Sequence, residues 1–195
     1  DEIIGGSIPK KSGPKGKKRE VSPDGKKVAL IGDSNAFTIN QHYKNDGDFM
    51  SGDDVQNHAL GGFGVNLKGK SWLKILNMLK AGKVSAGSPR EMAKAAQLIK
   101  FDPDTIIVTN LGGNDTGAYR KDSEKYLKDA KKLMRIVKEY NGSYAGAAAV
   151  MNRYETRQAL NNDLEKIAPS VGIPFHNHTK DAPYLYAVDD FDEFA

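Results

Sequence analysis

The sequence predicts an α/β protein whose parallel sheet is covered by helices on both faces. Short apolar segments typical of strands alternate along the chain with segments whose apolar residues recur at helical spacing. Five strands separated by helices imply right-handed crossovers and therefore a parallel sheet. At 195 residues, 38% of them hydrophobic, the chain is long enough for one domain with a substantial core.

The first half of the chain contributes two of the expected strands. Residues 27–31 (KVALI) form a short apolar run, and a helix is expected over about 35–43. Residues 55–60 (VQNHAL) are expected to form the second strand. Residues 71–80 place their apolar side chains at helical spacing, and residues 89–99 are expected to form a further helix.

The second half contributes the other three strands. Residues 105–109 (TIIVT) are rich in β-branched side chains, which favours a strand. Residues 123–140 have the pattern of a long amphipathic helix, and residues 144–150 consist of small residues that suit a strand between helices. A helix is expected over 156–167, and residues 172–175 are expected to open a fifth strand.

The first part of the chain has a different composition. Residues 1–26 are rich in glycine, proline and lysine, and they are expected to form a basic extension or linker before a domain over 27–195. Residues 1–27 hold eight Lys or Arg against four acids, so the net charge of +4 belongs to them. A solvated linker is expected, and a partner protein that orders it is an alternative. No aromatic residue lies among these lysines, which disfavours nucleic acid as a partner.

The composition also excludes some classes of site. The chain has no cysteine, so disulfides, thiolate metal sites and cysteine nucleophiles are excluded. No apolar run approaches the roughly 20 residues that span a bilayer, and the first residues do not resemble a secretion signal. A soluble protein is expected. The compartment stays open, with extracellular and virion-associated settings among the alternatives.

Polar stretches follow the first three expected strands. They are residues 32–34 (GDS), residues 57–62 (NHALGG) and residues 111–115 (LGGND). Because the carboxyl ends of parallel strands open onto one edge of the sheet, where ligands bind, we expect the three stretches to lie together.

Taken together, these stretches resemble the SGNH hydrolases, also called the GDSL family, over about residues 27–179. The family's GDS block matches 32–34, its second glycine matches Gly62, and its Gly-x-Asn-Asp block matches 112–115. The resemblance implies a three-layer α/β/α sandwich with a flavodoxin-like sheet of five strands in the order 2-1-3-4-5. It also implies cleavage of an ester, acetyl or thioester bond without a metal or organic cofactor.

The resemblance also assigns roles to individual residues. Acyl transfer creates an oxyanion, which needs hydrogen-bond donors placed in advance where the charge develops. Ser34 is the implied nucleophile, and its N–H, the N–H of Gly62 and the side-chain amide of Asn114 are the implied donors. Asp33, Asn35 and Asp115 are expected to contact the substrate. Each residue also has a simpler interpretation, because Ser34 can cap a helix and Asn114 can form a turn.

The family's C-terminal Asp-x-x-His block, which supplies the catalytic base, is not found. Asp192 stands where the histidine would be. His176 and His178 are expected to alternate on the fifth strand and so to share one face, and His58 lies nearer to the first strand. A His-x-His pair can bind a metal, but without further ligands nearby no metal site is predicted.

The missing block has three explanations. The chain is a processed or trimmed fragment, the base comes from elsewhere, or the fold has lost catalysis. The leading hypothesis is a serine esterase or deacylase that acts on an acyl or acetyl ester, for example of a glycan or cell-wall component. The alternative is a catalytically incomplete module of a larger assembly, such as a virion or secreted complex. Nucleic-acid binding by the extension is a third, less favoured hypothesis.

Overall fold

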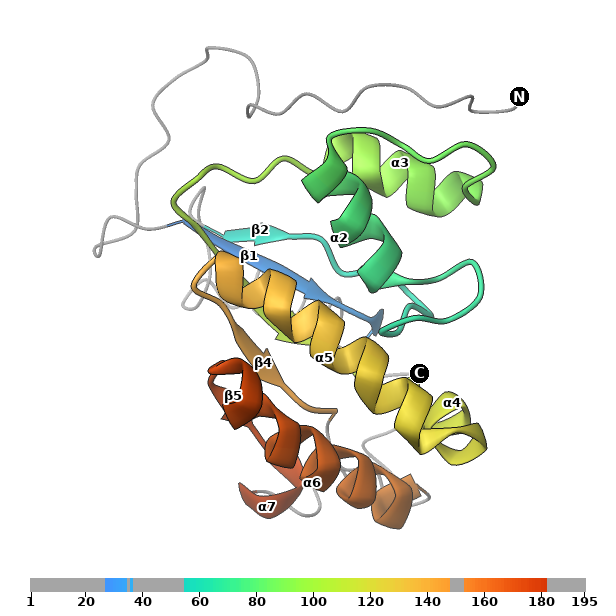
Figure 1. Ribbon diagram of the computed structural model, residues 1–195, viewed down its shortest axis with the longest axis vertical. Coiled ribbons are helices and arrows are strands. Elements are labelled where there is room, and N and C mark those ends of the chain that lie inside the picture. Colours follow the sequence, from blue (N-terminus) through green and yellow to red (C-terminus); the bar gives the residue numbers. More distant parts are fainter. Residues whose placement is uncertain (1–26, 35, 37–54, 148–152, 182–195) are drawn as a thin grey trace, which may run out of the picture.

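The computed structural model describes residues 27–34, 36, 55–147 and 153–181 (Figure 1). They form one five-stranded sheet in the order β2-β1-β3-β4-β5, and every neighbouring pair is parallel. The strands are β1 (Lys27–Gly32), β2 (Val55–Asn57), β3 (Thr105–Asn110), β4 (Ser143–Ala145) and β5 (Phe175–His176). The predicted fold class and strand order are therefore confirmed.

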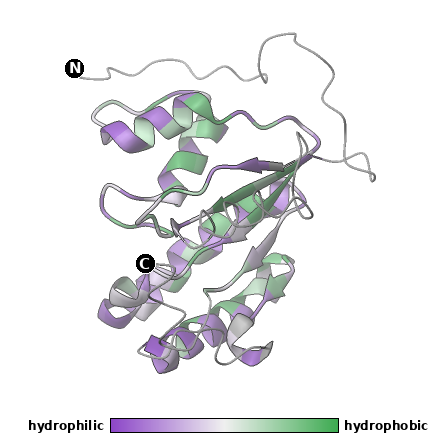
Figure 2. Ribbon diagram, turned by 180° about the vertical axis from the view of Figure 1, so that it is seen from behind, coloured by the Kyte–Doolittle hydropathy of each residue, from purple (hydrophilic) through white to green (hydrophobic). Residues whose placement is uncertain are grey.

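The helices that the structure describes follow β2, β3, β4 and β5, in pairs after β2 and β3. They are α2 (Trp72–Ala81), α3 (Arg90–Leu98), α4 (Thr116–Lys121), α5 (Ser123–Glu139), α6 (Tyr154–Val171) and α7 (His178–Asp181). Helices α2 and α5 lie in front of the sheet in Figure 1, and Figure 2 shows the strands from the opposite side. The helix expected over 35–43 lies outside the described residues except at Ala36. None of the described helices is long and apolar enough to cross a membrane.

The hydrophobic core lies between the central strands and these helices. Ile31 of β1 and Ile107 of β3 are fully buried, as are Trp72 of α2, Leu133 of α5 and Leu164 of α6. Burial of each such side chain contributes about 1.5–3 kcal/mol to folding. This packing fixes the sheet, and the sheet fixes the loops that leave its carboxyl edge.

Two elements differ from the sequence prediction for local reasons. Strand β2 ends at Asn57 and not at residue 60, because the Asn57 side chain turns back to accept a hydrogen bond from the Ala59 N–H. Helix α4 was not predicted. Its side chains make contacts with α6, where the Tyr119 hydroxyl donates to Asp163. Strand β4 ends at Ala145, and residues 148–150 of the predicted strand lie outside the described part of the chain.

The prediction that His176 and His178 share one face of the fifth strand is wrong. Strand β5 ends at His176, and His178 begins α7. Asn177 causes the change of structure, because its Oδ1 accepts hydrogen bonds from the N–H and hydroxyl of Thr179. An asparagine in this position ends the extended chain and starts a helical turn.

Candidate active site

The turn after β1, residues 32–34, is held in place at the Gly32 carbonyl; we call it the serine turn. The Gly32 oxygen accepts one hydrogen bond from Trp72 Nε1 at 2.9 Å and another from the Leu60 N–H at 3.0 Å. A side chain at Gly32 would have its Cβ 2.6 Å from the Ala36 Cβ and 2.8 Å from the Asn110 carbonyl oxygen. Only glycine fits in this space, so packing and not backbone freedom accounts for the residue.

The serine turn places its two polar side chains in different environments. Asp33 is 1% exposed, whereas Ser34 is exposed at the surface. Ser34 and Ala36 already have helical backbone, so Asp33 is the residue before the helix. This arrangement makes Ser34 accessible to a substrate and argues against a role as the helix N-cap. Asn35 lies outside the described residues, and its contact with substrate stays a prediction.

A second loop, residues 60–65, lies beside the serine turn; we call it the Gly62 loop. Leu60 at its start bonds the Gly32 carbonyl, and the carbonyl of Phe63 accepts a hydrogen bond from Asn114 Nδ2 at 3.0 Å. Gly62 lies between these two attachment points, with a φ of +76° that favours glycine. The loop is therefore held at both sides of Gly62.

The third loop, residues 111–115, follows β3; we call it the Asn114 loop. Gly112 has a φ of +123°, and its carbonyl accepts a hydrogen bond from the Asp115 N–H. The Asn114 side chain is exposed, and one N–H of its Nδ2 is used by the Phe63 carbonyl. An amide nitrogen carries two hydrogens, and the second has no acceptor among the residues that the structure describes. Asn114 is thus oriented by one bond and has one donor left for a ligand.

Asp115 lies on the inner side of the Asn114 loop, fully buried. Its Oδ1 accepts from the Val65 N–H at 3.1 Å, and its Oδ2 accepts from the Tyr126 hydroxyl at 3.3 Å. Burial, together with the nearby charge of Asp33, raises the pKa of Asp115 to about 7, against the effect of these two hydrogen bonds. In the structure the Asp115 oxygens bond Val65 of the Gly62 loop and Tyr126. The contact of Asp115 with substrate stays a prediction.

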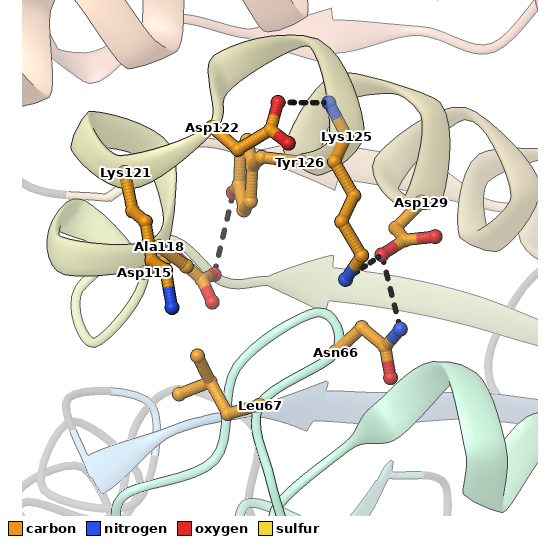
Figure 3. Close-up of a pocket in the computed structure, with 9 residues that line it drawn as sticks. All are labelled: Asn66, Leu67, Asp115, Ala118, Lys121, Asp122, Lys125, Tyr126 and Asp129. Atoms are coloured by element: carbon orange, nitrogen blue, oxygen red, sulfur yellow. Dashed lines mark hydrogen bonds and ion pairs between the residues drawn. The ribbon is translucent and has the colours of Figure 1, made fainter.

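A cavity of about 240 Å³ lies behind Asp115, between the loop after Val65 and helices α4 and α5 (Figure 3). Asp129 lines it and accepts from Asn66 Nδ2 at 3.0 Å, and Lys125 Nζ lies 3.6 Å from the same carboxylate. The other lining residues are Leu67, Asp115, Ala118, Lys121, Asp122 and Tyr126. The polar groups of this cavity bond mainly one another, which makes it a structural feature behind the candidate site.

Arg157 of α6 lies beneath the Asn114 loop. Its side chain is buried, and Nη2 donates to the Gly113 carbonyl at 3.2 Å. Burial and the neighbouring Arg153 lower the pKa of the Arg157 guanidinium, whereas the negative charge of Asp33 raises it. A buried carboxylate in the serine turn thus attracts a buried guanidinium under the Asn114 loop. This attraction links the serine turn to the Asn114 loop.

The histidines whose side chains the structure describes are His58 and His176. The Nε2 of His58 lies 3.1 Å from Gln56 Oε1, and its ring packs edge-on against Phe101 with centroids 6.0 Å apart. Burial lowers the pKa of His58 to about 4, which makes it a weak base. His176 is exposed on β5, and the side chain of His178 lies outside what the structure describes.

Lys70 is a neighbour of Gly62 that the sequence did not reveal. Its Nζ lies 2.7 Å from the point where a Cβ of Gly62 would stand. Lys68 and Lys70 lie on either side of Gly69 in the sequence NLKGKSW. Nothing in that pattern indicates which of the two lysines approaches Gly62. The chain turn between Leu67 and Lys70 decides which of the two reaches Gly62.

No protein-family model matches this chain, and no curated protein matches it. Among solved structures, an acetyl xylan esterase from the rumen bacterium Butyrivibrio proteoclasticus is similar, with 14% sequence identity and a TM-score of 0.45. The similarity covers 78% of this chain and 54% of that chain, so this chain spans about half the length of the esterase.

Proposed function

We propose that this protein is a serine hydrolase that cleaves an ester, with Ser34 as the nucleophile. The observation that carries the proposal is the position of Gly62, between one attachment to the serine turn and another to Asn114. An exposed hydroxyl, a left-handed glycine and an oriented amide donor are thus supplied by three connected loops. They lie at the edge of a parallel sheet where ligands bind.

In the proposed reaction, Ser34 Oγ forms a bond to the acyl carbon while its proton passes to a base. The carbonyl oxygen becomes an oxyanion that the Gly62 N–H and the free N–H of Asn114 stabilise. The bond to the alcohol then breaks, the alcohol takes up the proton, and water releases the acid from Ser34. A loop fixed before substrate arrives has little reorganisation to undergo during this reaction.

The base is proposed to be a histidine, and the chain has four: His42, His58, His176 and His178. His58 is the least suitable because burial keeps its pKa near 4. Single substitutions of the other three by Ala identify the base, since its loss lowers kcat without abolishing binding. If none of them lowers kcat, the base is not one of these three histidines.

A fluorophosphonate probe tests the nucleophile. We expect covalent labelling of the native protein, detected as a mass increase, and no labelling of Ser34→Ala. Ser170→Ala is the matched control, because Ser170 is exposed on α6 and its hydroxyl donates to the Ile167 carbonyl of the same helix. Labelling that persists in Ser34→Ala would place the nucleophile elsewhere.

The alternative is a binding module of a larger assembly, and it is favoured by the aspartate at position 192 where the family has its histidine. Under this alternative the intact protein is not labelled by the probe, yet it unfolds cooperatively. Labelling and unfolding measured on one preparation separate the two functions.

A further inference from the structure

The ammonium group of Lys70 occupies the space that the absent side chain of Gly62 leaves open. Three atoms of the Lys70 side chain lie within 3.6 Å of the ideal Cβ position of Gly62, and Nζ is the nearest at 2.7 Å. At any other residue type this space would hold a carbon atom. The glycine therefore admits a cation next to a proposed oxyanion donor.

The backbone of Lys70 is fixed, so this placement does not depend on the side chain alone. The Lys70 carbonyl accepts a hydrogen bond from the Gly64 N–H at 3.1 Å, and the Lys70 N–H donates to the Leu67 carbonyl at 3.2 Å. Ser71, the next residue, is buried and caps α2 through a hydrogen bond from the Lys74 N–H. The turn that carries Lys70 is thus joined both to the Gly62 loop and to α2.

Among the lysines that the structure describes, some pair with carboxylates and others, Lys70 and Lys68 included, do not. Lys27, Lys80 and Lys180 each form an ion pair with a carboxylate. Within the part of the chain that the structure describes, no carboxylate pairs with Lys70. Residues 28–195 are formally neutral as a whole.

We propose that Lys70 selects substrates that carry a negative charge beside the scissile ester, a carboxylate being the simplest case. This inference rests on the proposed esterase function. The Cβ and N–H directions diverge at a residue, so the ammonium lies to one side of the oxyanion position. We therefore expect it to meet a substituent of the carbonyl rather than the reacting oxygen. Charged donors bind anions more strongly than neutral ones, which makes Lys70 a specificity residue.

Two matched pairs of esters test the inference and locate the charge. In the first, 4-nitrophenyl hemisuccinate carries the carboxylate on the acyl side, and 4-nitrophenyl butyrate is its neutral partner. In the second, 4-acetoxybenzoate carries it on the alcohol side, and its methyl ester is the neutral partner. We expect Lys70→Gln to lower kcat/KM for the anionic member of one pair by about tenfold or more, mainly through KM, and to spare its neutral partner.

Lys68→Gln is the matched control, because it removes the same charge from the same turn two residues away. We expect it to leave the ratio of anionic to neutral kcat/KM unchanged. The inference is overturned if Lys70→Gln leaves that ratio unchanged in both pairs, or if the two variants have equal effects. A uniform loss for all four esters would indicate general stabilisation of the oxyanion and would also overturn it.

A binding measurement separates this inference from the proposed function. Titration calorimetry of 4-nitrophenyl hemisuccinate into Ser34→Ala measures affinity without turnover. We expect the affinity to fall by about tenfold in Ser34→Ala/Lys70→Gln and to weaken with added salt. Equal affinities in the two proteins overturn the role of Lys70 even if the probe labels Ser34. If the affinity falls but Ser34 is never labelled, the esterase function fails and the anion site stands.

Discussion

In the candidate site, the backbone of an individual residue is held in place by contacts that its neighbours make. Gly62 exemplifies this, because its N–H can serve as a donor only while Leu60 and Phe63 hold the chain on either side of it. Asn114 performs two tasks with one amide nitrogen, since one hydrogen holds the Phe63 carbonyl and the other is left for a ligand. Removal of this amide therefore affects a positioning contact and a proposed catalytic contact together.

Asn114→Ala and Asn114→Asp test this double role. We expect both to lower kcat for ester cleavage by about 10²–10³, because one oxyanion donor is lost, while KM changes little. Because the side chain is exposed, the free energy of unfolding should fall by no more than about 1 kcal/mol. Initial rates together with urea unfolding provide both values.

Asn77→Ala is the control for this pair, since Asn77 is an exposed asparagine on α2 outside the site. Asn77→Ala should change neither kcat nor the free energy of unfolding. If Asn114→Ala lowers the free energy of unfolding by as much as it raises the activation free energy of ester cleavage, Asn114 is a structural residue and not an oxyanion donor.

At the scale of elements, the site depends on how the Gly62 loop docks against the segment between β3 and α5. Asp115 is the anchor, because it accepts the Val65 N–H while Tyr126 of α5 holds its other oxygen. Burial raises the pKa of Tyr126 well above its ordinary value, so the hydroxyl stays a donor. Gly64 lets the loop approach this carboxylate, since a Cβ there would lie 2.1 Å from Asp115 Oδ1.

Gly64→Ala should therefore push the Gly62 loop away from Asp115. We expect a loss of about 2–4 kcal/mol in the free energy of unfolding, from overpacking and a weakened buried hydrogen bond. Probe labelling of Ser34 should slow as well. Gly61→Ala is a matched control three residues away, because a Cβ there meets no atom within 4 Å. It should change stability by less than about 0.5 kcal/mol, and similar losses for both variants would contradict the docking model.

At the scale of the whole molecule, two buried groups act in opposite directions on stability as the pH changes. Asp115 has its pKa raised from 3.8 to about 7, so the folded protein binds its proton more tightly and loses stability as pH rises through this window. His58 has its pKa lowered from 6.5 to about 4, so the folded protein loses stability as pH falls through that window. Between about pH 4 and 6.5 the two effects oppose each other.

Single substitutions should uncouple the two effects. Asp115→Asn removes the contribution of Asp115 and leaves that of His58. The free energy of unfolding should then rise with pH between 4 and 6.5 more steeply than in the wild type. In His58→Phe, which keeps an aromatic ring against Phe101, stability should fall as pH rises over the same range, relative to the wild type. Each difference should amount to a few kcal/mol at most. Urea unfolding at half-unit pH intervals and constant ionic strength measures both, and profiles parallel to the wild type would contradict the burial of these groups.

The elements that the sequence predicted well are those whose pattern is local. The apolar runs of β1 and β3 and the amphipathic pattern of α5 are visible in a short window of residues. Helix α4 has no such pattern, and its six residues are supported by side-chain contacts to α6, such as Arg120 to Thr156. A short window of sequence around α4 does not include the residues of α6 that make these contacts.

The proximity of the three loops was predictable to a similar degree, whereas the roles of their residues stay predictions. The rule that parallel strands end at one edge brought the three polar stretches together in the prediction, and their contacts through Leu60 and Asn114 follow from the strand order. The direction of His58 depends on packing against Phe101, and the reach of Lys70 depends on a turn. Neither has a signal in residue type or spacing.

The contacts that assemble the site join distant parts of the chain. Trp72 bonds Gly32 across 40 residues, Asn114 bonds Phe63 across 51, and Asp115 bonds Val65 across 50. Closing such long loops costs entropy that local structure does not recover, so we expect these contacts to form late in folding. During refolding, helical circular dichroism should return before reactivity toward the probe. A newly made chain would therefore gain its secondary structure before the proposed nucleophile became reactive.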